Sequence, residues 1–207
     1  MHQAEACTKR KTSLLLCMFD IEPWYGWLHL YDSEQDENSP FFGVEHNLFE
    51  YDRSIYDMPA HPLWEDFDSE NLLMKILYAD YNKGYCIIEL IGEWNDLQFN
   101  DFRLMRDNCL QYLYDAGIDK FILLCENVFS AFLEMEDYYE AFTEELWPDG
   151  YIHLLKARAE VKEEFLRYGI SAFVSWSESL DQLNWRKLHP DQILSLVEET
   201  NQKLLGK

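Results

Sequence analysis

The sequence predicts an α/β fold in which a central mixed, largely parallel sheet is flanked by helices. Two observations lead to this prediction. After residue 71, short apolar runs of strand length alternate with segments whose apolar residues recur at helical spacing. The resulting order is ββαβαβαβ with a last helix, and alternating units of this kind build parallel sheets with right-handed crossovers. Residues 1–71 are instead rich in aromatic and acidic residues and prolines, which predicts an N-terminal extension of short strands and loops packed on the main domain, residues 72–207.

The main domain should begin with a β-hairpin. Residues 72–81 and 85–92 are nearly continuous apolar runs, and Gly84 in the connection between them can supply the positive φ of a tight turn. Glu89 interrupts the second run. Pairing centred on the turn places it diagonally from Lys75 on the same face, so we expect a cross-strand ion pair between them.

The later elements follow in alternation. Helical spacing predicts helices over residues 102–116, 132–146 and 158–168, and a last helix that begins at Pro190. Strands are predicted over residues 120–125, 151–155 and 171–176. In the extension, we expect strands over residues 13–19, 26–31 and 43–51.

Aromatic residues are dense in the extension. They either line a binding groove or form the local core of a small subdomain. The residues in question are Trp24, Tyr25, Trp27, Phe41, Phe42, Phe49, Tyr51, Trp64 and Phe67.

The chain carries a large negative charge. It has 39 acidic and 17 basic residues, a net charge of −22, yet 48% of its residues are hydrophobic, so a folded core is expected. Such a field repels nucleic-acid phosphates and anionic membranes, and we expect the chain to bind neither. Residues 32–70 contain twelve carboxylates and one base, Arg53, and residues 126–149 contain eight carboxylates and no base. These segments are either solvated surface or a face that meets a basic protein partner.

Cysteines, histidines and glycines do not indicate a cofactor or a metal site. The five cysteines are scattered without a CxxC pair, which is typical of free thiols in a reducing compartment. The six histidines lack metal-ligand spacing, and the eight glycines are not clustered as a phosphate-binding loop requires. No apolar run is long enough to cross a membrane. We therefore expect a cytoplasmic protein without a cofactor.

The order of elements, with the stretches "YCIIELIGEWND" and "DNCLQYLYDAGIDKFILLCENV", resembles the STAS domains of anti-sigma factor antagonists over residues 72–176. The chain is also similar to bacterial proteins without an assigned function. The STAS resemblance implies a mixed sheet with helices against it, a protein partner, and phosphorylation of a Ser or Thr where the helix after the third strand begins. The matching stretch, "ENVFSAFLEM", has one hydroxyl residue, Ser130. The family usually shows an Asp before adjacent hydroxyl residues, which is missing here, so Ser130 is either a phosphosite or a cap of the following helix.

Polar residues follow the predicted strands. Ligands of open α/β sheets bind at the carboxyl ends of strands, and carboxylates with Lys156 or Arg158 nearby suit acid–base catalysis if burial moves their pKa values apart. The same residues also suit an ordinary strand exit and helix cap. The candidate lip for a ligand or partner consists of Glu93, Trp94, Asn95, Asp96, Glu126 and Asn127.

Three functions fit these observations. The first is a non-enzymatic, regulatory protein-binding module. The second is a small enzyme that uses the strand-end carboxylates. The third is an acidic inhibitor or immunity-type protein that neutralises a basic effector. An open pocket that holds Glu93, Asp96 and Glu126 together would favour the second function.

Overall fold

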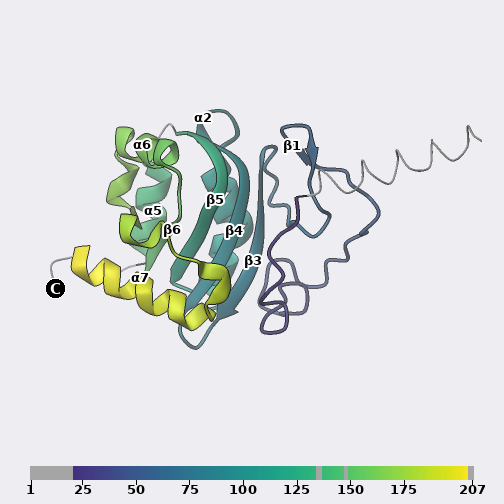
Figure 1. Ribbon diagram of the computed structural model, residues 1–207, viewed down its shortest axis with the longest axis horizontal. Helices are drawn as coiled ribbons and strands as arrows, with labels where there is room; N and C mark the ends of the chain where they lie inside the picture. Colours follow the sequence, from purple (N-terminus) through teal and green to yellow (C-terminus); the bar gives the residue numbers. More distant parts are fainter. Residues whose placement is uncertain (1–20, 134–136, 147–148, 205–207) are drawn as a thin grey trace, which may run out of the picture.

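The computed structural model of the chain describes residues 21–133, 137–146 and 149–204. Its centre is a five-stranded sheet with the order β3-β4-β5-β6-β7 (Figure 1). β3 and β4 are antiparallel, and every later pair is parallel. The predicted α/β class with a largely parallel sheet is confirmed. The strands are β3 (Leu72–Asp80), β4 (Tyr85–Asn95), β5 (Lys120–Phe132), β6 (Tyr151–Leu155) and β7 (Val174–Trp176).

The first two strands form the predicted hairpin. Asp80 lies opposite Tyr85, and Gly84 in the turn has a φ of +68°. A bulge after Ile76 shifts the register, because the residue that follows has no partner in β4. Lys75 consequently lies directly opposite Glu89 rather than diagonally from it.

Strands β4 and β5 run further than their apolar residues predict. The sequence predicts ends at Gly92 and Cys125, but both strands continue because their later residues pair with each other. Glu93, for example, lies opposite Ser130 in the parallel ladder. Glu93, Asn95, Glu126 and Asn127 therefore belong to the sheet, whereas Asp96 begins the helix that follows β4.

Gly92 allows a close backbone approach and does not end its strand. Its φ is +126°, and a Cβ atom at this position would lie 1.9 Å from the carbonyl oxygen of Asn71. The next amide, of Glu93, donates a hydrogen bond to that same oxygen at 2.9 Å. Glycine is needed because the backbone at Asn71, just before β3, approaches β4 closely at this point.

Helices cover one face of the sheet (Figure 1). The predicted helices over residues 102–116 and 158–168 are confirmed, whereas the one predicted from residue 132 begins at Asp137, because Phe132 still pairs in β5. Phe102, Phe142 and Phe165 bury the apolar sides of these helices against the sheet. The elements are α2 (Asp96–Phe99), α3 (Asp101–Met105), a π-helical turn (Arg106–Leu110), α4 (Gln111–Asp115), α5 (Asp137–Glu145) and α6 (Ala159–Arg167).

The last helix, α7 (Pro190–Leu204), packs on the second face of the sheet and begins where predicted. Ile193 and Val197 are fully buried there with Trp185, which precedes the helix. Trp27 joins the same cluster, and its indole N–H donates to the carbonyl oxygen of Leu188 at 3.1 Å. None of the helices that the structure describes is long and apolar enough to span a membrane.

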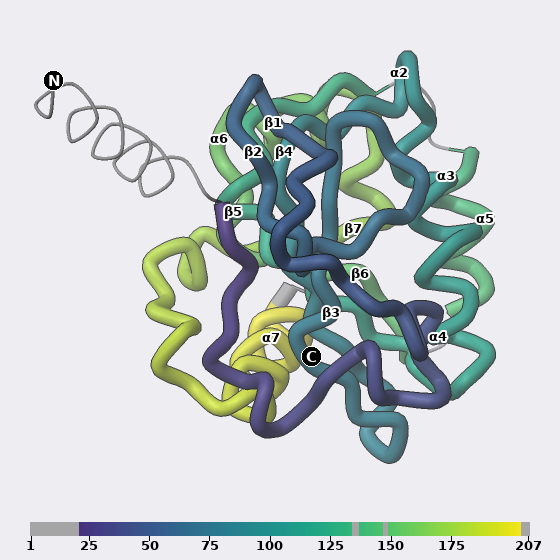
Figure 2. The backbone as a smooth tube through the Cα atoms, turned by 90° about the vertical axis from the view of Figure 1, so that its right-hand side faces the viewer, coloured from purple at the N-terminus to yellow at the C-terminus, as the bar shows by residue number. Residues whose placement is uncertain are grey.

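The N-terminal segment, residues 21–71, lies against the sheet beside β3 (Figures 1 and 2). In its described residues the strands are β1 (Ser54–Ile55) and β2 (Met58–Pro59). The strands predicted over residues 26–31 and 43–51 are wrong, because local hydrogen bonds close turns there, such as Leu30 N to Trp27 O at 2.7 Å. The strand predicted over residues 13–19 lies outside the described residues.

Three cysteines are buried free thiols, as predicted: Cys86, Cys109 and Cys125. Burial raises the pKa of each thiol above its ordinary value. Such thiols behave as small apolar side chains of low reactivity. Cys7 and Cys17 lie outside the described residues.

Candidate functional site

The predicted lip after β4 divides into core and cap residues. Trp94 is fully buried in the core on the helix side. Asn95 caps α2, since its Oδ1 accepts a hydrogen bond from Gln98 N at 2.9 Å, as the capping interpretation predicted. The Asp96 carboxylate accepts a hydrogen bond from the Tyr139 hydroxyl at 2.6 Å. Burial raises the pKa of Asp96, against the effect of this bond. The chain thus uses these three side chains to hold the sheet and helices together.

Ser130 lies within β5 and not at the start of a helix. Its hydroxyl donates to Glu93 Oε2 at 3.2 Å, and the hydroxyl of Tyr56, between β1 and β2, donates to the same oxygen at 3.2 Å. The interpretation of Ser130 as a helix cap is wrong, because pairing with β4 holds it in the strand. A phosphate on this hydroxyl would face the Glu93 carboxylate, and like charges this close repel.

Glu126 belongs to a cluster of charged groups on the second face of the sheet. Its Oε2 lies 3.1 Å from Lys156 Nζ, and its Oε1 pairs with Arg186. Burial opposes ionisation, but the two cations outweigh it and hold the pKa of Glu126 below its ordinary value. Asn127, the next residue of β5, is half-buried and lies opposite Ile91.

Glu89 lies at the centre of β4 and is 2% exposed. Its Oε2 accepts a hydrogen bond from the backbone amide of Trp24 at 2.9 Å, and its Oε1 lies 3.7 Å from Arg186. Burial raises the pKa of Glu89 to about 7; the Trp24 amide and Arg186 act in the opposite direction, and Glu126 adds to the rise. The side chain is therefore close to its point of half-protonation at neutral pH.

The ion pair predicted between Lys75 and Glu89 is wrong. Lys75 Nζ instead lies 2.9 Å from Glu34 and 3.0 Å from Glu65, both in the N-terminal segment. That segment covers the edge strand β3, where Glu65 also accepts a hydrogen bond from Ile76 N at 2.8 Å. Burial disfavours the Lys75 ammonium, but the two carboxylates outweigh it and raise the pKa of Lys75.

Lys75, Glu89 and Glu126 form a polar belt across β3, β4 and β5. The belt separates two apolar clusters on this face, one around Leu73 and the other around Ile122. Two neighbouring carboxylates whose pKa values are moved apart have the form of an acid–base pair. Sequence reasoning missed the partners Trp24 and Arg186, since no local pattern connects residues so distant along the chain.

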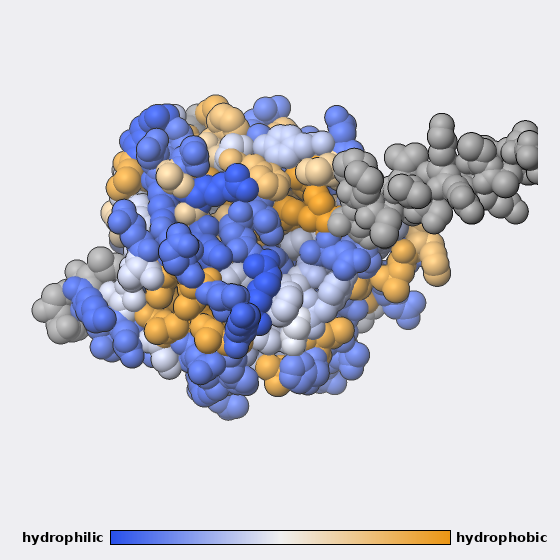
Figure 3. Space-filling view, viewed as in Figure 1, coloured by the Kyte–Doolittle hydropathy of each residue, from blue (hydrophilic) through white to orange (hydrophobic). Residues whose placement is uncertain are grey.

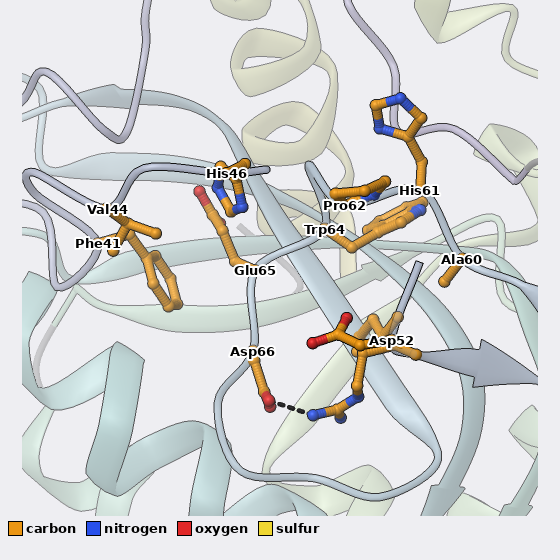
Figure 4. A pocket seen from close by; sticks show the side chains of 12 residues that line it. Phe41, Val44, His46, Asp52, Ala60, His61, Pro62, Trp64, Glu65 and Asp66 are labelled. Carbon is orange, nitrogen blue, oxygen red and sulfur yellow. Dashed lines mark hydrogen bonds and ion pairs between the residues drawn. The ribbon is translucent and has the colours of Figure 1, made fainter. Parts of the chain in front are cut away.

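A cavity of about 270 Å³ lies between the N-terminal segment and β3 (Figure 4). It does not hold Glu93, Asp96 and Glu126 together, since none of them lines it. Within the described ranges, no three His, Cys, Asp or Glu side chains are placed to hold a metal ion. The cavity is lined by Phe41, Val44, His46, Asp52, Arg53, Ala60, His61, Pro62, Trp64, Glu65, Asp66 and Leu73.

A short turn near this cavity exposes two apolar side chains. In this display turn, residues 47–50, the Asn47 side chain accepts a hydrogen bond from Phe49 N at 3.2 Å and donates one to Glu50 Oε2 at 3.0 Å. Glu50 N closes the turn on Asn47 O at 3.0 Å. Leu48 and Phe49 are 50% and 95% exposed. Sequence reasoning placed Phe49 in a groove or a local core, and its exposure was missed.

The two comparisons with known proteins gave no match. No model of a protein family matches the chain, and a search of curated proteins found no significant relative.

Proposed function

We propose that this chain is a non-enzymatic protein-binding module that captures a basic partner through the display turn. The observation that carries the proposal is the exposure of Leu48 and Phe49 at the tip of a turn that three hydrogen bonds hold in place. The turn therefore holds the side chains of Leu48 and Phe49 exposed to solvent. Aromatic residues are enriched at the centres of protein interfaces.

The exposed apolar surface extends along the chain on either side of the turn. Phe42 is 53% exposed, Val44 41% and Tyr56 55%. Single exposed apolar residues are ordinary in folded proteins, whereas several in one short segment are typical of an interaction surface. The view in Figure 3 shows a mostly hydrophilic surface with separate hydrophobic patches, one of them over the N-terminal segment.

The fixed backbone conformation of the display turn favours binding. Its hydrogen bonds fix the backbone before the partner arrives, so less conformational entropy is lost when Phe49 is buried in an interface. Burial of one aromatic side chain contributes about 1.5–3 kcal/mol. A few such anchors supply most of the affinity of a typical interface.

Charge defines the chemistry of the partner. Glu45, Glu50 and Asp52 accompany the exposed apolar residues, and the whole chain has a net charge of −22. Like charges that face each other across an interface cost several kcal/mol, so the complementary surface must be basic. This supports a protein partner rather than nucleic acid, and it fits both a regulatory module and an inhibitor of a basic effector.

The resemblance of the predicted order of elements to STAS domains supports a regulatory role. In that family a phosphorylated hydroxyl controls partner binding. Ser130 is the matching residue, but its hydrogen bond to Glu93 places a carboxylate where a phosphate would need a donor. We therefore propose that binding does not require phosphorylation of Ser130.

A small enzyme is the second candidate. The observation in its favour is the neighbouring pair Glu89 and Glu126, whose pKa values are moved in opposite directions. Substrate would need to reach Glu89, which is 2% exposed in this structure.

A photo-crosslinking experiment tests the binding proposal. A photoreactive phenylalanine replaces Phe49 in one variant and Leu166 in a control variant. Leu166 is 58% exposed on α6, which Figure 1 shows on the opposite side of the sheet from the N-terminal segment. Irradiation in native lysate should give adducts with basic proteins at position 49 and not at position 166. The same adducts at both positions would rule out the display turn as the contact.

A further inference from the structure

The cavity beside β3 combines an aromatic wall with a carboxylate that has no partner. The indole N–H of Trp64 donates to Ile21 O at 2.7 Å, which fixes the ring in the wall. Asp52 is exposed and lines the same cavity, so it lies at the mouth. Figure 4 shows its carboxylate between Trp64 and Asp66, and Asp66 pairs with Arg53. Among the residues that the structure describes, none forms a hydrogen bond or an ion pair with this carboxylate.

Arg53, Glu65 and Asp66, which also line the wall, each have a partner of opposite charge. Arg53 pairs with Asp66 and also donates to the carbonyl oxygen of Ser69. Glu65 accepts a hydrogen bond from the backbone amide of Ile76 and lies 3.0 Å from Lys75. The uncompensated charge of the cavity is therefore the negative charge of Asp52.

The negative charge of Asp52 favours a ligand of positive charge. An anion would meet the unpaired carboxylate of Asp52, which repels it. A cation would pair with Asp52 and lie near the Trp64 ring, where the quadrupole of the indole attracts it. The volume of about 270 Å³ is at the small end of ligand sites, which admits a compact group and excludes a nucleotide-sized molecule.

We propose that this cavity binds an organic cation, an ammonium or guanidinium group on a small apolar body, between Asp52 and Trp64. The apolar body would rest on Pro62, which lies beside Trp64 in Figure 4 and also lines the cavity. The cation can come from a free small molecule or from a Lys or Arg side chain of a protein. The site consists of residues that line the cavity, and residues of the display turn are not among them.

Calorimetric titration of the full chain at low salt tests the site. The probes are benzylamine, which is a cation at neutral pH, and its neutral and anionic counterparts, benzyl alcohol and benzoate. We expect binding of benzylamine alone. Asp52→Asn should weaken it by about tenfold or more, because a charge-assisted contact is lost. The control Asp57→Asn removes an exposed carboxylate that does not line the cavity and should leave the affinity unchanged.

A second pair of titrations separates the two sources of the cation. A blocked lysine peptide is titrated alongside benzylamine into the wild-type chain and the Asp52→Asn variant. Binding of benzylamine that depends on Asp52 supports a free ligand. Binding of the peptide alone, again dependent on Asp52, supports a protein side chain. Equal weakening by Asp52→Asn and Asp57→Asn, equal binding of benzoate, or no binding of either cation throughout their soluble range would overturn the proposal.

Discussion

The carboxylate of Glu89 in β4 accepts a hydrogen bond from the backbone amide of Trp24 at 2.9 Å. Arg186, which precedes α7, faces the same carboxylate at 3.7 Å, and its guanidinium lies over the Trp24 ring at 5.7 Å. One buried carboxylate therefore holds segments from both ends of the described chain on the second face of the sheet. The arrangement makes the protonation of Glu89 a determinant of stability.

Replacement of Glu89 by Gln should stabilise the protein above neutral pH. The folded pKa of Glu89, about 7, is raised above its unfolded value, so the wild-type chain loses stability as pH rises through the interval between the two values. The loss is on the order of 3 kcal/mol if the unfolded pKa is about 4.3. Glutamine keeps an oxygen for the Trp24 amide and does not ionise. Urea unfolding at pH 5 and pH 8 measures the difference.

The exposed Glu160 provides the control for this titration. Glu160→Gln should leave the difference between the two pH values as it is in the wild-type chain. If Glu89→Gln and Glu160→Gln show the same pH dependence as the wild-type chain, Glu89 is not the group that titrates near neutrality.

Replacement of Gly92 by Ala should strongly destabilise the fold. A Cβ atom would lie 1.9 Å from Asn71 O, a backbone atom that cannot move without breaking its hydrogen bond to Glu93 N. We expect a loss of at least about 3 kcal/mol, from the clash and the positive φ together. Gly43→Ala is the matched control, since Gly43 also has a positive φ, +74°, but open space around it. Its cost should be about 1–2 kcal/mol in denaturant unfolding. Equal losses would refute the steric explanation.

The elements that could be predicted from the sequence are those whose signal is local. Residues 151–155 form a strand as predicted, because they are a short apolar run between a glycine and charged residues. Pro190 begins a helix, since its fixed φ suits the first helical position. The hairpin around Gly84 follows from two apolar runs and a short turn.

The parts that could not be predicted depend on contacts between distant residues. Glu126 and Asn127 interrupt the apolar run of β5 as a strand exit would, and the strand continues past them because Ser130 and its neighbours pair with β4. Glu89 contacts Trp24 and Arg186 through tertiary packing. The hairpin alone offers Lys75 as the nearest opposite charge, and the predicted ion pair with Lys75 is wrong because Lys75 pairs with Glu34. In the candidate lip, Glu126 forms an ion pair with Lys156, and Trp94 is buried in the core.

Replacement of Ser130 by Asp should destabilise the chain rather than imitate a switch. The new carboxylate would lie against Glu93, with which the Ser130 hydroxyl now forms a hydrogen bond at 3.2 Å. Like charges on paired strands are unfavourable, and we expect a loss of about 1 kcal/mol or more in denaturant unfolding. In the Glu93→Gln background the loss should shrink, as a double-mutant cycle would show. Recovery of phosphate on Ser130 from native cells, by mass spectrometry, would contradict this account.

Replacement of Leu48 and Phe49 by Ser should leave stability unchanged and abolish capture of the partner. Both side chains are exposed, and the hydrogen bonds of the turn involve Asn47, Glu50 and backbone atoms. Surface substitutions of this kind usually change stability by less than about 0.5 kcal/mol. Thermal unfolding of the double variant checks this before any binding experiment. A large loss of stability would mean that the two residues support the fold and not an interface.

Affinity capture from native lysate, with the wild-type chain and the Leu48→Ser, Phe49→Ser variant, tests whether the display turn binds a basic protein. Captured proteins are quantified by mass spectrometry at 0.1 M and 1 M salt, over which the Debye length falls from about 10 Å to about 3 Å. We expect the wild-type chain to capture proteins more basic than the background at low salt, and we expect their loss both at high salt and in the double variant. Capture of proteins no more basic than the background, or capture that the double substitution and salt leave unchanged, would contradict this expectation.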